Sequence, residues 1–331
     1  MINIPIVYGI GNPLVDIIFH ATDKDIEILN LKKGSMDLVN EKRQKEIIDY
    51  FKIENCSIMP GGSAPNTILA CNGLGVPSVL SGKIGNDKFG DIYLDQINRY
   101  NVLSQVVQGR GPTGTSVVLI TPDAERTMNT HLGMCREYSD KDIDEELLSR
   151  SSFLYFTGYM WDTDSQKEAI QKAVSIARSN NIKICLDVAD PFVVERNKEE
   201  FLEFIKKNVD IVFANKPELT ILFQYEDIEL SIKELMKIVK CGCVKMGEKG
   251  SVVFNNSEIY QIQPKEISAI DTTGAGDMYA AGFLSSFSKS GDYKISGKIG
   301  SIVAEEIIQI NGAQFSKDEI DHIRSKISIF H

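Results

Sequence analysis

The chain has 331 residues, of which 43% are hydrophobic and 25% charged, the balance of an ordinary globular enzyme with a large core. Its formal net charge of −10 argues against a general affinity for nucleic acid or for an anionic membrane, so we expect small-molecule partners and a monomer or homodimer. The six cysteines form no C-x-x-C pair, and the first residues do not read as a secretory leader. Both observations favour a cytoplasmic protein without a zinc site or disulfide framework.

The first 131 residues mix strands and helices without a simple alternation. Ser63 is the expected N-cap of a helix, and the Pro-Gly-Gly that precedes it is expected to break regular structure. We predict strands at 6–10, 14–19, 35–39 and 79–84, helices at 41–53, 63–74 and 87–100, and a hairpin of strands at 115–121 and 126–131.

From residue 151 onward, strands and helices alternate regularly. Strands predicted at 153–156, 183–187 and 211–214 each precede a helix. This pattern predicts an α/β fold with a doubly wound, mainly parallel sheet and helices on both faces. The short strands within 12–40 and 113–131 do not fit the alternation. We expect them to form a small β-sheet lid, inserted into a single domain that spans the whole chain, across the edge where ligands bind in such folds.

The segment 271–277 reads Asp-Thr-Thr-Gly-Ala-Gly-Asp and runs directly into an apolar helix at 278–287. The first N–H groups of a helix have no intrahelical partner and its dipole favours negative charge, so small residues here predict a phosphate site. A carboxylate at Asp277 is costly beside an anion unless it does chemistry, such as taking a proton from an attacking hydroxyl. The simpler interpretation is that Asp271 caps the helix and the glycines shape a turn.

Three further segments place polar groups at predicted strand ends or helix starts. They are 11–16, which ends in an aspartate, 61–66, which holds two glycines and an amide, and 215–218, with an amide and a carboxylate three residues apart. Each alone is explained by a cap or a turn. All of them fall on the side of an α/β sheet where ligands bind, so together they predict a site.

These segments carry a resemblance to a known family. Gly61-Gly62 with Asn66, and the segment 271–277, resemble the two signatures of the ribokinase-like (PfkB) carbohydrate and nucleoside kinases, and Asn215-x-x-Glu218 resembles that family's N-x-x-E motif. Within the family, 11–16 and 158–162 are most similar to adenosine kinases, bacterial ones included. The resemblance covers essentially the whole chain and implies the ribokinase-like fold.

The resemblance implies a catalytic and a substrate-binding set. The base would be Asp277, and backbone N–H groups would hold the developing charge on the transferred phosphoryl group, with Tyr159 facing a purine or, equally well, serving as core. The catalytic set is Asp277, Gly274, Ala275 and Gly276, and the substrate set is Asp16, Gly61, Gly62, Ser63, Asn66 and Tyr159.

The same resemblance implies how ATP and metal ions would be held. Mg²⁺ would be organised through water, and a K⁺ ion is expected behind the anion site. The nucleotide set is Asn215, Lys245, Gly247, Gly250 and Thr272, the Mg²⁺ set is Asn215 and Glu218, and the K⁺ set is Asp271, Thr273, Gly312 and Ser316. Arg136 is a loosely matched candidate for neutralising the phosphates, and a solvated surface arginine is as good an interpretation of it.

The resulting hypothesis is an ATP-dependent kinase of the 5′-hydroxyl of a purine nucleoside, with adenosine converted to AMP in purine salvage. The alternatives are another nucleoside such as inosine or guanosine, or a ribose- or fructose-like sugar, because a fold does not fix a substrate. A non-catalytic binding protein on the same scaffold is a remote third interpretation.

Overall fold

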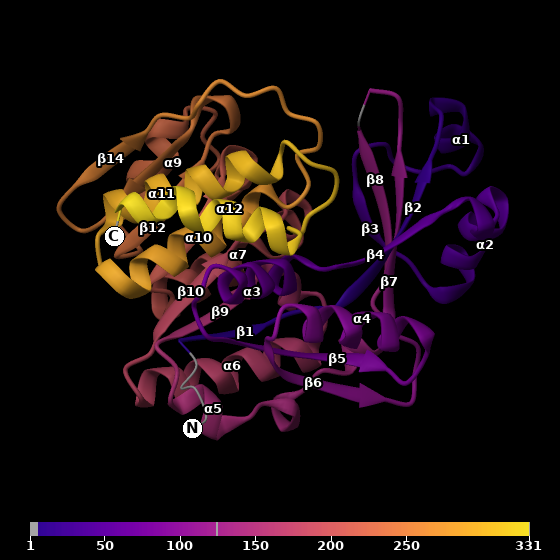
Figure 1. Ribbon diagram of the computed structural model, residues 1–331, viewed down its shortest axis with the longest axis horizontal. Coiled ribbons are helices and arrows are strands. Elements are labelled where there is room, and N and C mark those ends of the chain that lie inside the picture. Colours follow the sequence, from indigo (N-terminus) through magenta and orange to yellow (C-terminus); the bar gives the residue numbers. More distant parts are fainter. Residues whose placement is uncertain (1–5, 124, 331) are drawn as a thin grey trace.

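The computed structural model describes residues 6–123 and 125–330. Its largest element is a nine-stranded sheet in which seven neighbouring strands run parallel and the last two, β13 and β14, run antiparallel at one edge (Figure 1). In spatial order the strands are β14 (Ile259–Ile262), β13 (Ser251–Phe254), β12 (Cys241–Lys245), β11 (Ile211–Asn215), β10 (Lys183–Asp187), β9 (Phe153–Thr157), β1 (Val7–Ile10), β5 (Ser78–Gly85) and β6 (Leu103–Gly109).

Helices cover both faces of this sheet, because its central strands are apolar on both sides. In β9, Tyr155 packs into the core of one face, whereas Leu154 and Phe156 pack into the core of the other. The first face carries α3 (Ser63–Gly73), α4 (Lys88–Arg99), α10 (Ala275–Ser290), α11 (Tyr293–Ile307) and α12 (Lys317–Ile327). The second face carries α5 (Glu145–Ser149), α6 (Asp164–Ser179), α7 (Pro191–Asn208), α8 (Lys216–Phe223) and α9 (Ile228–Met236). The doubly wound α/β prediction is confirmed.

A second sheet of five strands stands to one side of the first (Figure 1). In spatial order its strands are β3 (Met36–Leu38), β8 (Arg126–His131), β7 (Gly114–Ile120), β2 (Leu14–His20) and β4 (Ser57–Gly61). The helices α1 (Asp23–Ile28) and α2 (Glu41–Phe51) contribute Ile26 and Ile47 to a small apolar core shared with Ile17 and Val117. The small sheet predicted from the irregular strands is therefore present.

The sequence analysis predicted no strand at β4 or β6, each at the edge of its sheet, and gave no ranges for β12, β13 and β14. The segment expected to break regular structure ends β4, whose Pro60 is tolerated because β4 lies at the edge of its sheet. The other is β6, at the edge of the large sheet, where its mixed exposure leaves no continuous apolar run to recognise. The small sheet thus also takes in β4, which lies outside the two ranges predicted for the lid.

Within the described residues, the chain passes between the two sheets at three short segments rich in glycine or proline and at one longer segment. The short crossings are 11–13, between β1 and β2, Gly62, between β4 and α3, and 110–113, between β6 and β7, and the longer one is 132–152, between β8 and β9. The first two start from or lead to the carboxyl-terminal edge of the parallel strands, which places the candidate site between the sheets. No helix within 6–123 and 125–330 is long and apolar enough to cross a membrane.

Candidate active site

The helix α10 begins without a side-chain cap. Its N-cap is Gly274, in the left-handed conformation with φ 73°, and no side chain accepts from its first N–H groups. The interpretation of Asp271 as the cap is wrong: its carboxylate accepts from the N–H groups of Thr273 and Gly312, both at 2.9 Å. Since the first turn is left open, its N–H groups and the helix dipole form a site for an anion.

Asp277 lies in the first turn of α10 and is held by the start of α3. Ser63 Oγ donates to its Oδ1 at 2.6 Å, and Asn66 Nδ2 donates to its Oδ2 at 3.0 Å. Burial among neighbouring atoms raises the pKa of this carboxyl to about 7, although the two hydrogen bonds oppose the shift. A carboxylate with a pKa near 7 is suited to accept a proton at neutral pH.

Ser63 reaches Asp277 because it does not serve as the N-cap that the sequence predicted. The N-cap of α3 is Gly62, with φ 99°, and a Cβ at this position would lie 2.1 Å from Asn12 O. Only glycine fits there, and with Gly62 as the N-cap, Ser63 is the first residue of α3 rather than its cap. The Ser63 hydroxyl is then free to donate to the carboxylate of α10.

Gln314 fixes the orientation of the Asn66 amide. Its Nε2 donates to Asn66 Oδ1 at 2.9 Å and to the carbonyl of Pro60 at 3.2 Å. The oxygen of Asn66 therefore faces Gln314 and the nitrogen faces Asp277. Gln314 was not among the predicted site residues, since a lone glutamine in a loop gives no sequence signal for a contact 248 residues away.

Asp16 comes into the site from β2 of the small sheet. A Cβ at Gly61 would lie 2.5 Å from Asp16 Oδ2, so the glycine makes room for this carboxylate. Burial raises the pKa of Asp16 to about 7, Arg126 opposes the shift, and Asp277 adds to it. The two carboxyls are thus near enough to influence one another's pKa, although Asp16 lies in the small sheet and Asp277 in a helix that covers the large one.

Lys245 is the cation at the centre of the site. Its Nζ contacts both oxygens of Asp187, at 2.9 and 3.1 Å, and it would lie 3.0 Å from a Cβ at Gly276, the second residue of α10. Burial acts to lower the pKa of Lys245, but Asp187 and Glu218 more than offset this and raise it. Asp187 was missed by the sequence analysis, although its place at the end of a predicted strand is a usable signal.

Asn215 and Glu218 face one another at the start of α8. They form a capping box, in which Glu218 N donates to Asn215 Oδ1 at 2.9 Å and Asn215 N donates to Glu218 Oε2 at 2.8 Å. Burial raises the pKa of Glu218 to about 8, and Lys245 opposes the shift. Within the described ranges, no three His, Cys, Asp or Glu side chains cluster as metal ligands.

The four residues proposed for K⁺ are only partly brought together. Asp271, Thr273 and Gly312 contact one another beside the start of α10, and Arg126 of β8 adds an ion pair to Asp271 at 2.9 Å. Ser316 is engaged elsewhere, as the N-cap of α12.

Two cavities meet at the start of α10, and Lys245, Thr272, Ala275 and Gly276 line both. The first, the substrate cavity, has about 380 Å³ and is lined by Asp16, Gly62, Ser63, Asn66, Tyr159, Asp187, Asn215, Glu218, Gly274 and Asp277, with apolar walls at Met36, Leu38, Met128 and Leu132. The second, the nucleotide cavity, has about 620 Å³ and is lined by Gly247, Gly250, Pro264, Ile267, Ala269, Tyr279, Ala304 and Ile308 among others. Ligands in the two cavities would touch across the open helix turn.

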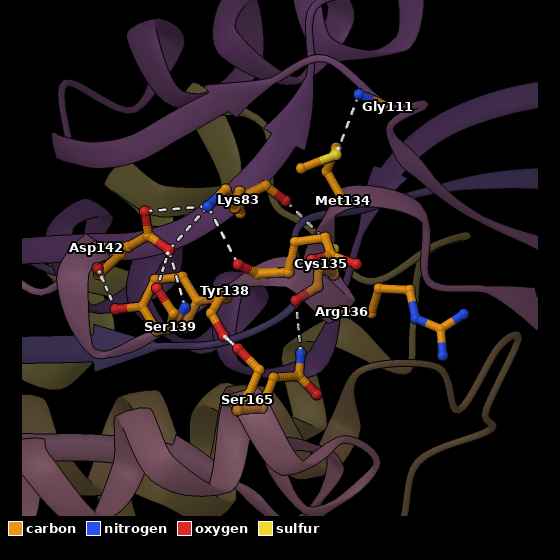
Figure 2. A network of polar contacts seen from close by, with 12 residues as sticks. Lys83, Gly111, Met134, Cys135, Arg136, Tyr138, Ser139, Asp142 and Ser165 are labelled. Carbon is orange, nitrogen blue, oxygen red and sulfur yellow. Dashed lines mark hydrogen bonds and ion pairs between the residues drawn. The ribbon is translucent and has the colours of Figure 1, made fainter.

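Arg136 takes no part in either cavity. It lies in the 3-10 helix η2 (Gly133–Glu137), and Figure 2 shows its guanidinium turned away from the polar network of Lys83, Ser139 and Asp142. It lines a separate cavity of about 510 Å³. The basic residue that the small sheet sends to the start of α10 is Arg126, which the sequence analysis did not single out.

Comparison with known proteins identifies the family. Residues 35–320 match the pfkB family carbohydrate kinases. The chain belongs to this family. Its structure resembles the adenosine kinase from Sinorhizobium meliloti with a TM-score of 0.92 and 33% identity, covering 98% of this chain and 99% of that one. A probable sugar kinase from Rhizobium etli gives the same TM-score and coverage at 31% identity.

A curated relative agrees over nearly the full length. The adenosine kinase of Schizosaccharomyces pombe is 23% identical over 330 residues, covering 93% of this chain and 95% of the relative. The pfkB protein is therefore a nucleoside or sugar kinase with the ribokinase-like fold, and its family uses ATP as the phosphoryl donor.

Proposed function

We propose that this pfkB kinase phosphorylates the 5′-hydroxyl of a purine nucleoside, with adenosine as the preferred substrate, converting adenosine and ATP to AMP and ADP. The observation that carries the proposal is the meeting of two cavities at the open start of α10, with Asp277 beside the junction. The similarity to the adenosine kinase of Sinorhizobium meliloti supports adenosine. Purine salvage in the cytoplasm is the role that we propose for it.

In this proposal the nucleoside lies in the substrate cavity. Asp16 accepts hydrogen bonds from ribose hydroxyls, next to Asn66 and the backbone of Gly61 and Gly62. The purine lies between the apolar side chains of the small sheet and Tyr159, whose hydroxyl donates to Asp190 at 3.2 Å. Burial of a flat apolar base is favourable in such a slot, and stacking on one aromatic face is worth roughly 1–3 kcal/mol per base.

The reaction follows from the placement of charge. Asp277 takes the proton of the 5′-hydroxyl as that oxygen forms its bond to the γ-phosphorus, and the bond from phosphorus to the leaving ADP oxygen breaks. The N–H groups of Gly274, Ala275 and Gly276, with the Lys245 ammonium, stabilise the charge on the transferred group. Arg126 is the better-placed lid cation for the phosphates, in place of Arg136.

The remaining nucleotide and metal assignments are part of the same proposal. Gly247 and Gly250 line the nucleotide cavity with positive φ, which lets the backbone approach a base, and Asn215 with Glu218 orients Mg²⁺ through water. Asp271, Thr273 and Gly312 lie where K⁺ would order the turn, with Ser316 as the least supported ligand. Equal rates in K⁺ and in a large organic cation, at one ionic strength, would remove the K⁺ assignment.

A substrate screen tests the proposal directly. Adenosine, inosine, guanosine, ribose and fructose are offered with Mg²⁺-ATP, and kcat/KM is measured for each by coupled ADP release. We expect adenosine to give the highest value. The second candidate is a sugar kinase, favoured by the name of the Rhizobium etli neighbour. A higher kcat/KM for ribose or fructose than for every nucleoside would replace the nucleoside assignment with it.

A further inference from the structure

One carboxylate at the substrate cavity has no partner for one of its oxygens. Asp162 follows the 3-10 helix η4 (Gly158–Trp161) and lines the substrate cavity at the same end as Leu38 and Tyr159. Its side chain is 2% exposed, and its Oδ1 accepts from Arg196 Nη2 at 2.9 Å. Its Oδ2 is buried and, among the described residues, accepts no hydrogen bond. Burial raises the pKa of this carboxyl to about 6, with Arg196 opposing the shift.

An unpaired buried carboxylate oxygen is a costly feature that a ligand can relieve. Leaving a buried acceptor unsatisfied costs about 1–3 kcal/mol, and more for a charged group. Elsewhere in the cavity, Asp277, Asn66 and Asp187 already hold partners among themselves or with Ser63 and Lys245. Asp162 differs because its Oδ2 has no partner among the described residues, in a cavity whose walls include apolar side chains. The complementary ligand group is a neutral N–H donor on a largely apolar ring.

We propose that Asp162 is a specificity-determining residue that accepts a hydrogen bond from the 6-amino group of a purine in the substrate cavity. This inference rests on the proposed nucleoside kinase function and names the base edge that the site selects. A carboxylate can only accept, so it matches an amino group. At the same position a 6-oxo purine presents a carbonyl oxygen, an acceptor that a carboxylate cannot pair with.

The charged donors on the far side of Asp162 line the neighbouring cavity and not the substrate cavity, so they do not serve a 6-oxo purine there. Arg196 contacts Asp162 from the neighbouring cavity of about 510 Å³, which it lines with Arg136 and Lys167, and it does not line the substrate cavity. Asp162 and Leu38 are the residues that line both cavities. Arg196 is therefore a positioning residue, which holds Oδ1 on its own side and leaves Oδ2 for the base.

This arrangement makes Asp162→Asn a directional test. Arg196 donates, so the amide of the variant places its oxygen toward Arg196 and its nitrogen where Oδ2 was, turning an acceptor into a donor. We measure kcat/KM for adenosine, inosine and purine riboside, which lacks the 6-amino group, in the wild type and the variant. The ratio of adenosine to inosine should fall by about 10- to 100-fold, and wild-type preference for adenosine over purine riboside should disappear.

Controls separate this result from a general loss of structure. Asp164→Asn makes the same change two residues away. Asp164 lines the neighbouring cavity of about 510 Å³ but not the substrate cavity, so this variant should leave all three kcat/KM ratios unchanged. Binding of the same nucleosides without ATP, by calorimetry, gives a second reading that does not depend on turnover. Thermal unfolding of each variant identifies any that fails to fold, and the wild-type comparison of adenosine with purine riboside stands in either case.

Three outcomes would overturn the inference. If adenosine is the best substrate but purine riboside is equally good, Asp162 does not read the 6-amino group, and the kinase assignment stands. If the Asp162→Asn ratios equal those of the wild type, the same conclusion holds. If a free sugar is preferred to every nucleoside, the proposed function fails and this inference fails with it.

Discussion

The two cavities at the start of α10 are built in different ways. The substrate cavity is walled by the carboxyl groups of Asp16, Asp277 and Glu218, whose pKa values are raised mainly because these groups are buried. The nucleotide cavity is walled by glycines and small apolar side chains together with the charged residues Glu248, Lys265, Glu266 and Glu305. The first holds the buried carboxyl groups that can accept a proton near neutral pH, whereas the second offers glycine backbone and charged side chains around its apolar walls. The groups for catalysis and for substrate selection thus lie on the substrate-cavity side of the first turn of α10.

Asp277→Asn should have the largest effect on turnover, because it removes the proton acceptor from the substrate cavity. Loss of a general base lowers rates by roughly 10²–10⁴-fold, and we expect kcat to fall within this range. Binding of an ATP analogue, measured by calorimetry, should be retained since the open helix turn remains. A kcat within a few-fold of the wild type would show that Asp277 is not the base.

Lys245→Thr tests the cation that both cavities share. Removing one partner of a buried ion pair leaves the other charge uncompensated, which costs about 3–5 kcal/mol of stability. The matched control is Lys83→Thr, because Lys83 forms an equally short pair with Asp142, 2.9 Å long, away from both cavities (Figure 2).

Denaturant unfolding and turnover together distinguish the two lysines. Both variants should unfold at lower urea concentration than the wild type, but only Lys245→Thr should lose turnover at a temperature where it is folded. If both variants lose activity in proportion to their stability, Lys245 is a structural residue alone.

Paired substitutions should separate the two cavities in their Michaelis constants. Ala304→Phe places a ring in the nucleotide cavity and should raise KM for ATP by about tenfold, leaving KM for the nucleoside unchanged. Tyr159→Ala removes the aromatic face from the substrate cavity and should raise KM for adenosine by about tenfold, leaving KM for ATP unchanged. Initial rates with one substrate varied at a time provide the check. Each variant is the control for the other, and equal effects on both constants would mean that the cavities are not independent.

The smallest expected effect is a pH dependence of folding stability that comes from the Asp277 carboxyl in the substrate cavity. The folded-state pKa of Asp277 is raised to about 7, so between about pH 4 and 7 the folded protein binds a proton that the unfolded chain releases. Stability from this group therefore falls as pH rises through that window and levels off above it. Asp277→Asn should raise Tm by a few degrees more at pH 8 than at pH 5, as measured by calorimetry in parallel buffers. An equal change in Tm at the two pH values would contradict the raised pKa.

The same contrast explains what could be predicted from the sequence. The alternation after residue 151 predicted the layered sheet, and the segments 61–66 and 271–277 located both sides of the Asp277 contact, because strand ends and helix starts carry local signals. The loop 264–269 has no such signal, and its place in the nucleotide cavity depends on packing against α11. Arg126 could not be recognised as the partner of Asp271, since the register of β8 with its neighbours places it there.

The residue that orients the amide of Asn66 is synthesised long after Asn66 itself. Strand β1 ends at Ile10 and Asn66 lies in α3, so both are synthesised early. Gln314, whose hydrogen bond to the Asn66 oxygen leaves the Asn66 nitrogen facing Asp277, is synthesised much later. Asp277 itself follows after most of the sheet. A chain emerging from the ribosome can thus pair β1, β5 and β9 before Asp277 and Gln314 have been synthesised, so the sheet can form before the site that it supports is complete.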